Sequence, residues 1–209
     1  MRRDTRTRIL VASLLLFNEH GEPNTSTNEI ADEVDISPGN LHYHFRKKSE
    51  LVEALLHEFQ ADARRTLEPP VERAVALDDF WVFLHDLLEL TAAYRFLFRD
   101  MESLTSAYPK VGNALKHFAR GLTAVFALYL QGLAYGGVIR PAGFDAMLVS
   151  RNLAVIALYS ERFDALVESS HSPDDSALRI AGSVLSVLVP FVAEDSAAEL
   201  AELAAYYRQ

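Results

Sequence analysis

Two helix-start signals separated by a short turn constrain this chain more than any other feature of its sequence. Ser26 stands three residues before Glu29, which is the spacing of a capping box, where each side chain accepts a hydrogen bond from a backbone N–H at a helix start. Ser37 and Pro38 follow, a favoured N-cap residue and a favoured first helical residue. Apolar residues at helical spacing come after both signals. The segment is therefore predicted to form two short helices joined by a tight turn.

The remaining sequence is predicted to be helical throughout. A helix over about residues 4–20 precedes the pair and closes at Gly21, because glycine is favoured just past a helix end. A longer amphipathic helix begins near Leu51 and ends before Pro69 and Pro70. No run of strict alternation bounded by turn residues predicts a strand. The fold class is therefore all-α, with further helices expected near residues 78–94, 96–108, 110–135, 143–168 and 174–193, before a short amphipathic tail.

Composition narrows the classes of function. The chain of 209 residues is 50% hydrophobic and carries a formal net charge of -9, so it can bury a core but is not a generally basic nucleic-acid coat. The absence of cysteine excludes disulfides, thiolate nucleophiles and cysteine-based metal sites. The apolar run at residues 9–17 is too short for a signal peptide or a membrane span. We therefore expect a cytoplasmic protein with no membrane partner, in which any contact with DNA is local.

The pair of short helices at residues 26–48 has the pattern of a helix-turn-helix, whose second helix enters the major groove of DNA. The same segment resembles the N-terminal signature of the TetR family of transcriptional regulators. The matching residues are Thr27, Ile30, Ala31, Ile36, Ser37, Gly39, Leu41, Tyr43, His44, Phe45, Lys48 and Leu51. The resemblance implies an N-terminal three-helix DNA-binding domain (1–48), a connecting helix (49–68) and a C-terminal helical ligand-sensing and dimerisation domain (69–209).

Two positions depart from the family pattern. The turn usually carries glycine where this chain has Asp35. Aspartate tolerates the left-handed backbone conformation, so the turn is expected to persist. The first aromatic residue of the family's usual run is His42 here, which alters the possible base contacts and leaves the operator sequence open.

The second short helix is expected to have a core side and a DNA side. Leu41 and Phe45 lie four residues apart and should face the core. The opposite side presents Asn40, which can form a bidentate pair with adenine, and His42, which can contact a base edge. The resemblance implies that phosphates are contacted by Thr27, Ser37, Tyr43, His44 and Lys48, and helix N-termini add backbone donors. The full predicted DNA-binding set is Thr27, Ser37, Pro38, Gly39, Asn40, His42, Tyr43, His44 and Lys48.

Other interpretations of these residues stay open. In an arbitrary helix His42 and His44 are solvated or capping side chains, and a metal site is disfavoured because residues two apart point to different sides of a helix. No metal and no cofactor are expected. The basic side chains near the motif are either solvated surface or a local positive field that attracts phosphates. They are Arg2, Arg3, Arg6, Arg8, Arg46, Lys47 and Lys48.

The C-terminal half combines large aromatic residues with sparse polar groups. That mixture fits either a buried ligand pocket with a few orienting contacts or an ordinary core. The predicted pocket set is Trp81, His85, Phe98, Met101, His117 and Phe118. The family resemblance implies that the last two long helices pair with those of a second copy. The apolar seam predicted for them consists of Leu153, Ile156, Ala157, Leu185, Leu188 and Val189.

The sequence therefore predicts a homodimeric DNA-binding transcriptional regulator. It is expected to bind a palindromic operator as a repressor and to be released by an unknown small apolar or amphipathic ligand. An all-helical enzyme with an incidental helix-turn-helix is disfavoured, because the chain lacks an HExxH pattern, a glycine-rich phosphate loop and a Gly-x-Ser-x-Gly elbow. A non-specific architectural DNA binder is disfavoured by the acidic net charge and by the large apolar C-terminal half.

Overall fold

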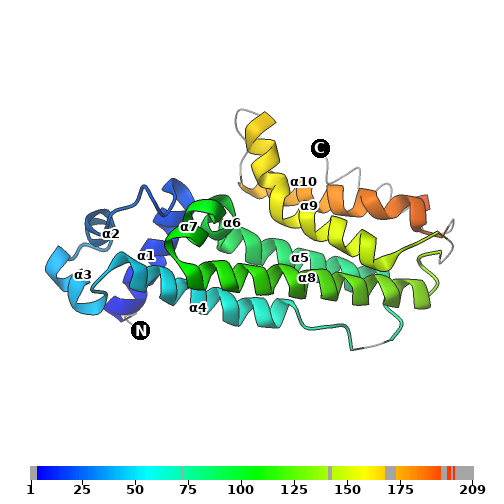
Figure 1. Cartoon of the computed structure of the whole chain (residues 1–209), viewed down its shortest axis with the longest axis horizontal. Helices are drawn as coiled ribbons and strands as arrows, with labels where there is room; N and C mark the ends of the chain where they lie inside the picture. The colour runs from blue at the N-terminus through cyan, green and yellow to red at the C-terminus, as the bar shows by residue number, and fades with distance from the viewer. Residues whose placement is uncertain are drawn as a thin grey trace. The chain divides into compact units, whose positions relative to one another are not determined.

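The structure is a computed structural model that describes residues 4–71, 73–140, 143–167, 173–193, 197, 198 and 200 (Figure 1). Its helices are α1 (Thr5–His20), α2 (Thr27–Glu33), α3 (Pro38–His44), α4 (Lys48–Thr66), α5 (Leu77–Ala93), α6 (Arg95–Arg99), α7 (Met101–Ala107), α8 (Pro109–Tyr135), α9 (Ala146–Val167) and α10 (Pro173–Leu188), followed by a 3-10 turn at Val189–Phe191. Within these residues the only β pairing is one isolated bridge, between Ile139 and Val192. The all-α fold class is confirmed. None of the described helices is long and apolar enough to cross a membrane.

Both predicted helix starts are present. The Ser26 hydroxyl accepts from the Glu29 N–H at 3.2 Å, and the Glu29 carboxylate accepts from the Ser26 N–H at 2.6 Å, so the capping box that begins α2 is complete. The Ser37 hydroxyl accepts from the Asn40 N–H at 3.2 Å and caps α3, whose first residue is Pro38. These bonds satisfy N–H groups that have no partner inside a helix.

The turn between α2 and α3 depends on one residue. Asp35 has a φ of 54° and is the only residue other than glycine with a positive φ among the described residues. The expectation that aspartate replaces glycine in this left-handed position is confirmed. Asp35 therefore sets the direction in which α3 follows α2, in a turn that contains no glycine.

The chain forms two compact units. The N-terminal unit contains residues up to Ala63 together with Ala93–Lys116, and the C-terminal unit contains Arg64–Ala92 together with the residues from His117 onward. Thus α6, α7 and the first turns of α8 belong with α1 to α3. The domain boundaries predicted at residues 48 and 68 follow sequence order, because no local pattern indicates that residues 93–116 belong with the N-terminal helices. These boundaries stay a prediction.

The predicted single helix over residues 96–108 is wrong. Asp100 separates α6 from α7, with a φ of -101° and a ψ of 24° that are not helical. Pro109, which lies between the helices expected near residues 96–108 and 110–135, is the first residue of α8. Proline is tolerated there because its missing N–H would have no partner in any case.

In the C-terminal unit, aromatic side chains join α5 to α8. Phe83 stacks on Tyr129 with ring centroids 4.5 Å apart and an interplanar angle of 14°. Phe80 and Phe126 pack around this pair, with ring centroids 6.2 Å apart. Both of these phenylalanines are fully buried. The cluster therefore forms the centre of this unit's core.

The helices α9 and α10 also pack closely on one another in the C-terminal unit (Figure 1). The apolar seam predicted on them is wrong for four of its members, which are buried inside the chain's own core and present no surface to a second copy. These are Leu153, Ala157, Leu185 and Leu188. The helices are apolar on more than one side, and the sequence pattern does not tell which side is covered within the protomer.

Candidate nucleic-acid interface

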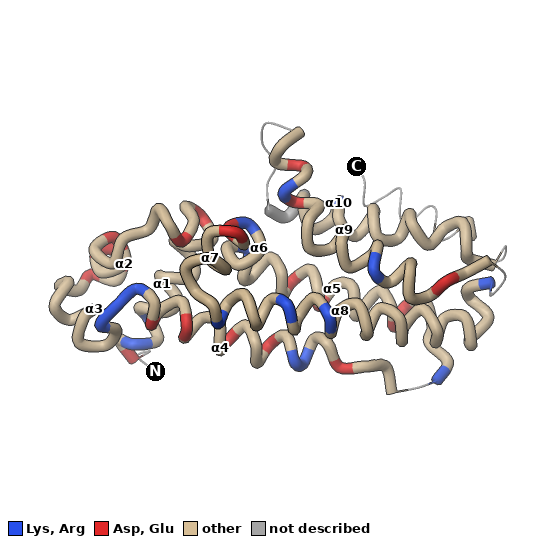
Figure 2. The backbone as a smooth tube through the Cα atoms, viewed as in Figure 1, with Lys and Arg blue, Asp and Glu red and all other residues tan. Residues whose placement is uncertain are grey.

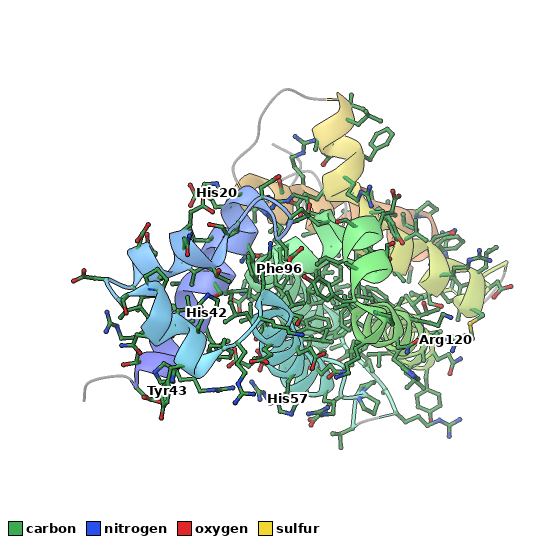
Figure 3. All side chains as sticks on the ribbon, turned by 60° about the vertical axis from the view of Figure 1, so that its left-hand side comes forward. His20, His42, Tyr43, His57, Phe96 and Arg120 are labelled. Atoms are coloured by element: carbon green, nitrogen blue, oxygen red, sulfur yellow. The ribbon has the colours of Figure 1, made fainter. Side chains whose placement is uncertain are left out.

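The helix α3 has one buried side and one exposed side. Leu41 is fully buried and Phe45, just past the helix end, is 2% exposed, which confirms the core side predicted for this helix. Pro38, Gly39, Asn40, His42 and Tyr43 are all exposed. Among the described tyrosine, phenylalanine and tryptophan side chains, that of Tyr43 is the most exposed, at 84%; Figure 3 labels it with His42 on α3. An 84% exposed tyrosine buries little area within the protomer, so its ring is available to another molecule.

The predicted phosphate-contacting residues surround that exposed side. Thr27 is the first residue of α2 and is half-buried, while Ser37 caps α3 through its hydroxyl. The ring of His44 is half-buried and meets that of Tyr43 edge to face, at a centroid distance of 5.3 Å. In the structure these residues lie at helix ends, Thr27 at the start of α2, Ser37 at the start of α3 and His44 at its end. Their assignment as DNA contacts stays a prediction.

Lys48 is held differently from the other members of the set. Its ammonium group lies 3.1 Å from the Glu22 carboxylate and donates to the Glu22 carbonyl oxygen at 2.5 Å. Glu22 also accepts from the Tyr108 hydroxyl at 2.7 Å, and its side chain is only 7% exposed. Burial raises the pKa of Tyr108, and the bond to Glu22 raises it further. Lysine has three N–H donors, so one remains for a phosphate.

Some of the basic side chains near the motif are exposed, and others make contacts within the N-terminal unit. Figure 2 shows a basic segment between α3 and α4, where Arg46 and Lys47 are exposed. The guanidinium of Arg6 lies 4.9 Å from the centre of the Phe45 ring, and Arg8 donates to the Val34 carbonyl oxygen at 2.6 Å. Arg6 and Arg8 therefore also hold the N-terminal unit together. Arg2 and Arg3 lie outside the described residues.

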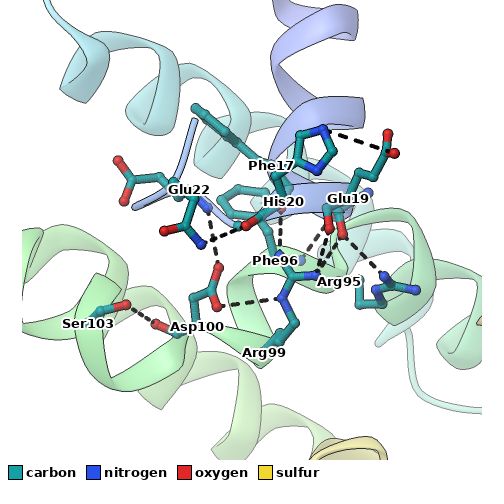
Figure 4. A network of polar contacts seen from close by, with 12 residues as sticks. Phe17, Glu19, His20, Glu22, Arg95, Phe96, Arg99, Asp100 and Ser103 are labelled. Atoms are coloured by element: carbon teal, nitrogen blue, oxygen red, sulfur yellow. Dashed lines mark hydrogen bonds and ion pairs between the residues drawn. The ribbon is translucent and has the colours of Figure 1, made fainter. Parts of the chain in front are cut away.

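The end of α1 is fixed by residues that no sequence pattern predicted (Figure 4). Arg99 of α6 donates to the carbonyl oxygens of Phe17 and Asn18 at 3.0 and 2.9 Å. The Asn18 side chain accepts from the Phe96 N–H at 3.0 Å and donates to the Ala93 carbonyl oxygen at 2.8 Å. These contacts satisfy carbonyl groups that a helix end leaves without partners. No local signal marks them, because the partners are about 80 residues apart in sequence.

The predicted ligand-pocket set is dispersed. Phe98 and Phe118 are buried, Trp81 and Met101 are half-buried, and His85 and His117 are exposed. His85 lies 3.1 Å from the Glu89 carboxylate one turn along α5. Phe98 and Met101 belong to the N-terminal unit and the other four to the C-terminal unit. The set stays a prediction, and none of its members lines the cavity of about 400 Å³ that lies in the C-terminal unit.

A metal site needs several ligating side chains close together. Among the described residues, no group of three or more histidine or acidic side chains has the required arrangement. An exposed polar side of a capped helix, placed after a left-handed turn, instead defines a helix-turn-helix DNA-binding protein.

Two family models together match most of the chain. One, described as "Bacterial regulatory proteins, tetR family", matches residues 9–55. The other, described as "Bacterial transcriptional repressor", matches residues 58–200. The chain belongs to the TetR family and is a DNA-binding transcriptional regulator.

Individual relatives agree with this placement. The HTH-type transcriptional regulator UidR of Escherichia coli (strain K12) is 28% identical over 137 residues, which cover 66% of this chain and 70% of that protein. The uncharacterized HTH-type transcriptional regulator YvkB of Bacillus subtilis (strain 168) is 36% identical over 141 residues, which cover 66% and 72%. The crystal structure of a TetR-family transcriptional regulator from Marinobacter aquaeolei VT8 matches with a TM-score of 0.87 and 30% identity, over 99% of this chain and 100% of that one. All three are named as transcriptional regulators and not as enzymes.

Proposed function

We propose that this protein is a homodimeric repressor that binds a palindromic operator and is released from it by a small apolar or amphipathic ligand. The observation that carries the proposal is the exposed side of α3. Asn40 and His42 supply hydrogen-bonding groups for base edges, and Tyr43 supplies an exposed ring and hydroxyl. The backbone of Gly39 is exposed as well and lacks a side chain that would hold DNA away. Together these residues form a reading surface, defined here as the exposed side chains of residues 38–43.

A second observation supports the dimer. One side of α9 exposes a stripe of apolar side chains at intervals of seven, four, four and three residues, which places them on one side of a helix. The stripe, here called the α9 stripe, consists of Leu148, Val155, Tyr159, Phe163 and Leu166, which are 44% to 83% exposed. An exposed apolar stripe of this kind is typical of a helix covered by a partner. Two copies joined by a two-fold axis present two α3 helices to two half-sites.

The reading surface is tested with single variants on a duplex recovered by selection from random DNA. Loss of a base-edge contact costs about 1–3 kcal/mol, so Asn40→Ala should weaken binding by about ten- to one-hundred-fold. Tyr43→Ala should weaken it as well. Asn113→Ala is the matched control, because Asn113 is exposed on α8. Unchanged operator affinity in both α3 variants would show that another surface reads the DNA.

A further inference from the structure

One cavity in the C-terminal unit is lined by both aromatic and acidic side chains. It lies between the end of α4, residues 68–71, 74 and 75, α5 and α8. Four of its lining residues, Asp79, Val82, Phe83 and Asp86, follow one side of α5 at intervals of three, one and three. At about 1.5 Å per residue, the two carboxylates are about 10 Å apart along the helix axis, with the apolar pair between them.

The apolar part of the lining is aromatic. Tyr129 of α8 lines the cavity, and its half-buried ring stacks on Phe83 at 4.5 Å. Phe83 itself is 3% exposed and fixed by the core cluster. The cavity therefore has a rigid aromatic wall, which is the kind of surface on which a flat ring or an organic cation is held.

The charged part of the lining is mainly negative. Three carboxylates, those of Glu68, Asp79 and Asp86, face one guanidinium, that of Arg65. Asp79 accepts from the Ala76 N–H at 2.9 Å through one oxygen. Within the described part of the chain, the Asp86 carboxylate has no hydrogen-bond or ion-pair partner.

The negative charges of the lining act on the aromatic wall. Burial raises the pKa of Tyr129, and the charges of Asp79 and Asp86 raise it further. Both carboxylates are thus close enough to the phenol to oppose a second negative charge there. An anionic ligand would meet the same repulsion, whereas a cation would be attracted.

The rim of the cavity is held in place by a close backbone approach. The Val75 N–H donates to the Gly132 carbonyl oxygen at 3.2 Å, and the Val75 side chain lies where a side chain on Gly132 would have to be. Pro69 and Pro70 restrict the other end of the same segment. The cavity is therefore formed before any ligand arrives, which is the usual state of small-molecule sites.

We propose that this cavity is the effector site and that its effector is an amphipathic organic cation. The cationic group lies near Asp79 and Asp86, and its apolar ring lies against Tyr129. A volume of about 400 Å³ is in the lower part of the range of about 300–1,000 Å³ for ligand pockets, so the effector is compact. The assignment of this ligand as an effector rests on the proposed function, while binding of the cation does not.

Binding is measured first, by calorimetry on the full-length protein without DNA. The probe is naphthylmethyl-trimethylammonium, and the control probe is its neutral isostere with carbon in place of nitrogen. The cation should bind more tightly, and added salt should weaken it. Asp86→Asn should lower its affinity by about three- to ten-fold. Asp78→Asn is the matched control, because Asp78 is exposed on α5 but does not line the cavity.

Release from DNA is measured second, on the selected operator duplex. The cation should dissociate the wild-type complex at lower concentration than it dissociates the Asp86→Asn complex. Equal binding of the cation and its isostere, or an unaltered affinity in Asp86→Asn, overturns the cavity assignment even when operator binding is intact. Binding without release overturns the effector role alone. Failure of the protein to bind any specific duplex refutes the proposed function and leaves the calorimetric result standing.

Discussion

Alanine in place of Gly132 is expected to destabilise the C-terminal unit. A Cβ atom at this position of α8 would overlap the Val75 side chain and lie 3.4 Å from the Arg73 carbonyl oxygen. Val75 is 3% exposed, and its N–H donates to Gly132 itself. Displacing the valine therefore weakens both its packing and this hydrogen bond.

The magnitude follows from three contributions. Overpacking costs about 1–3 kcal/mol, and a weakened hydrogen bond adds about 1 kcal/mol. Alanine is a better helix former than glycine by about 1 kcal/mol, which offsets part of this cost. The expected net loss is about 1–3 kcal/mol. The matched control is Gly121→Ala in the same helix and unit, where a Cβ atom would meet only the Cδ1 atom of Leu67, at 3.2 Å.

The assay is thermal and denaturant unfolding of both variants at one fixed protein concentration, since the proposed dimerisation would make stability concentration-dependent. For a chain of this size, 1 kcal/mol corresponds to about 2–4 °C in Tm. Gly132→Ala should melt lower than the wild type, and Gly121→Ala should melt at or slightly above it. Equal Tm values for the two variants would refute the close approach of Val75 to α8.

Three further predictions concern other parts of the molecule. Arg99→Ala removes the donors to the end of α1 and should cost about 1–2 kcal/mol in unfolding experiments; no loss would contradict this role. The Ser26 N–H lowers the pKa of Glu29 below its ordinary value of 4.5. The stabilisation that the ionised Glu29 carboxylate gives to the start of α2 is therefore complete above pH 4.5 and is lost as the pH falls through the lowered pKa. The difference in unfolding free energy between wild type and Glu29→Gln should therefore vanish in acid. A difference that persists there refutes the capping role. Phe163→Glu should yield monomers in sedimentation experiments. The control is Leu15→Glu, at an exposed position of α1, which should leave the dimer intact. A dimeric Phe163→Glu would exclude the α9 stripe as the interface.

Local chemistry accounts for what the sequence predicted well. The capping box at Ser26 and the Ser37 and Pro38 start each act within four residues, so their signals are complete in the sequence. Asp35 was predictable for the same reason, because a left-handed turn depends on the residue that occupies it. The N-terminal helices could therefore be placed almost to the residue.

Contacts between distant segments were not predictable in the same way. Tyr108 and Glu22 are 86 positions apart, and the sequence of each gives no sign of the other. Lys48 was expected to face phosphates, yet its ammonium group is directed mainly to Glu22. Leu153 was placed on a dimer seam, although it is buried within the protomer. On a helix that is apolar on several sides, only the tertiary packing decides which side is covered.

The central claim is that the exposed side of α3 reads a symmetric operator. Its most direct test is selection of bound duplexes from a random DNA library by the wild-type protein, followed by sequencing. We predict an inverted repeat with half-sites about one or two helical turns apart, and no enrichment of that repeat by the Asn40→Ala, Tyr43→Ala double variant. Recovery of no common sequence, or of the same repeat by the double variant, would contradict the claim.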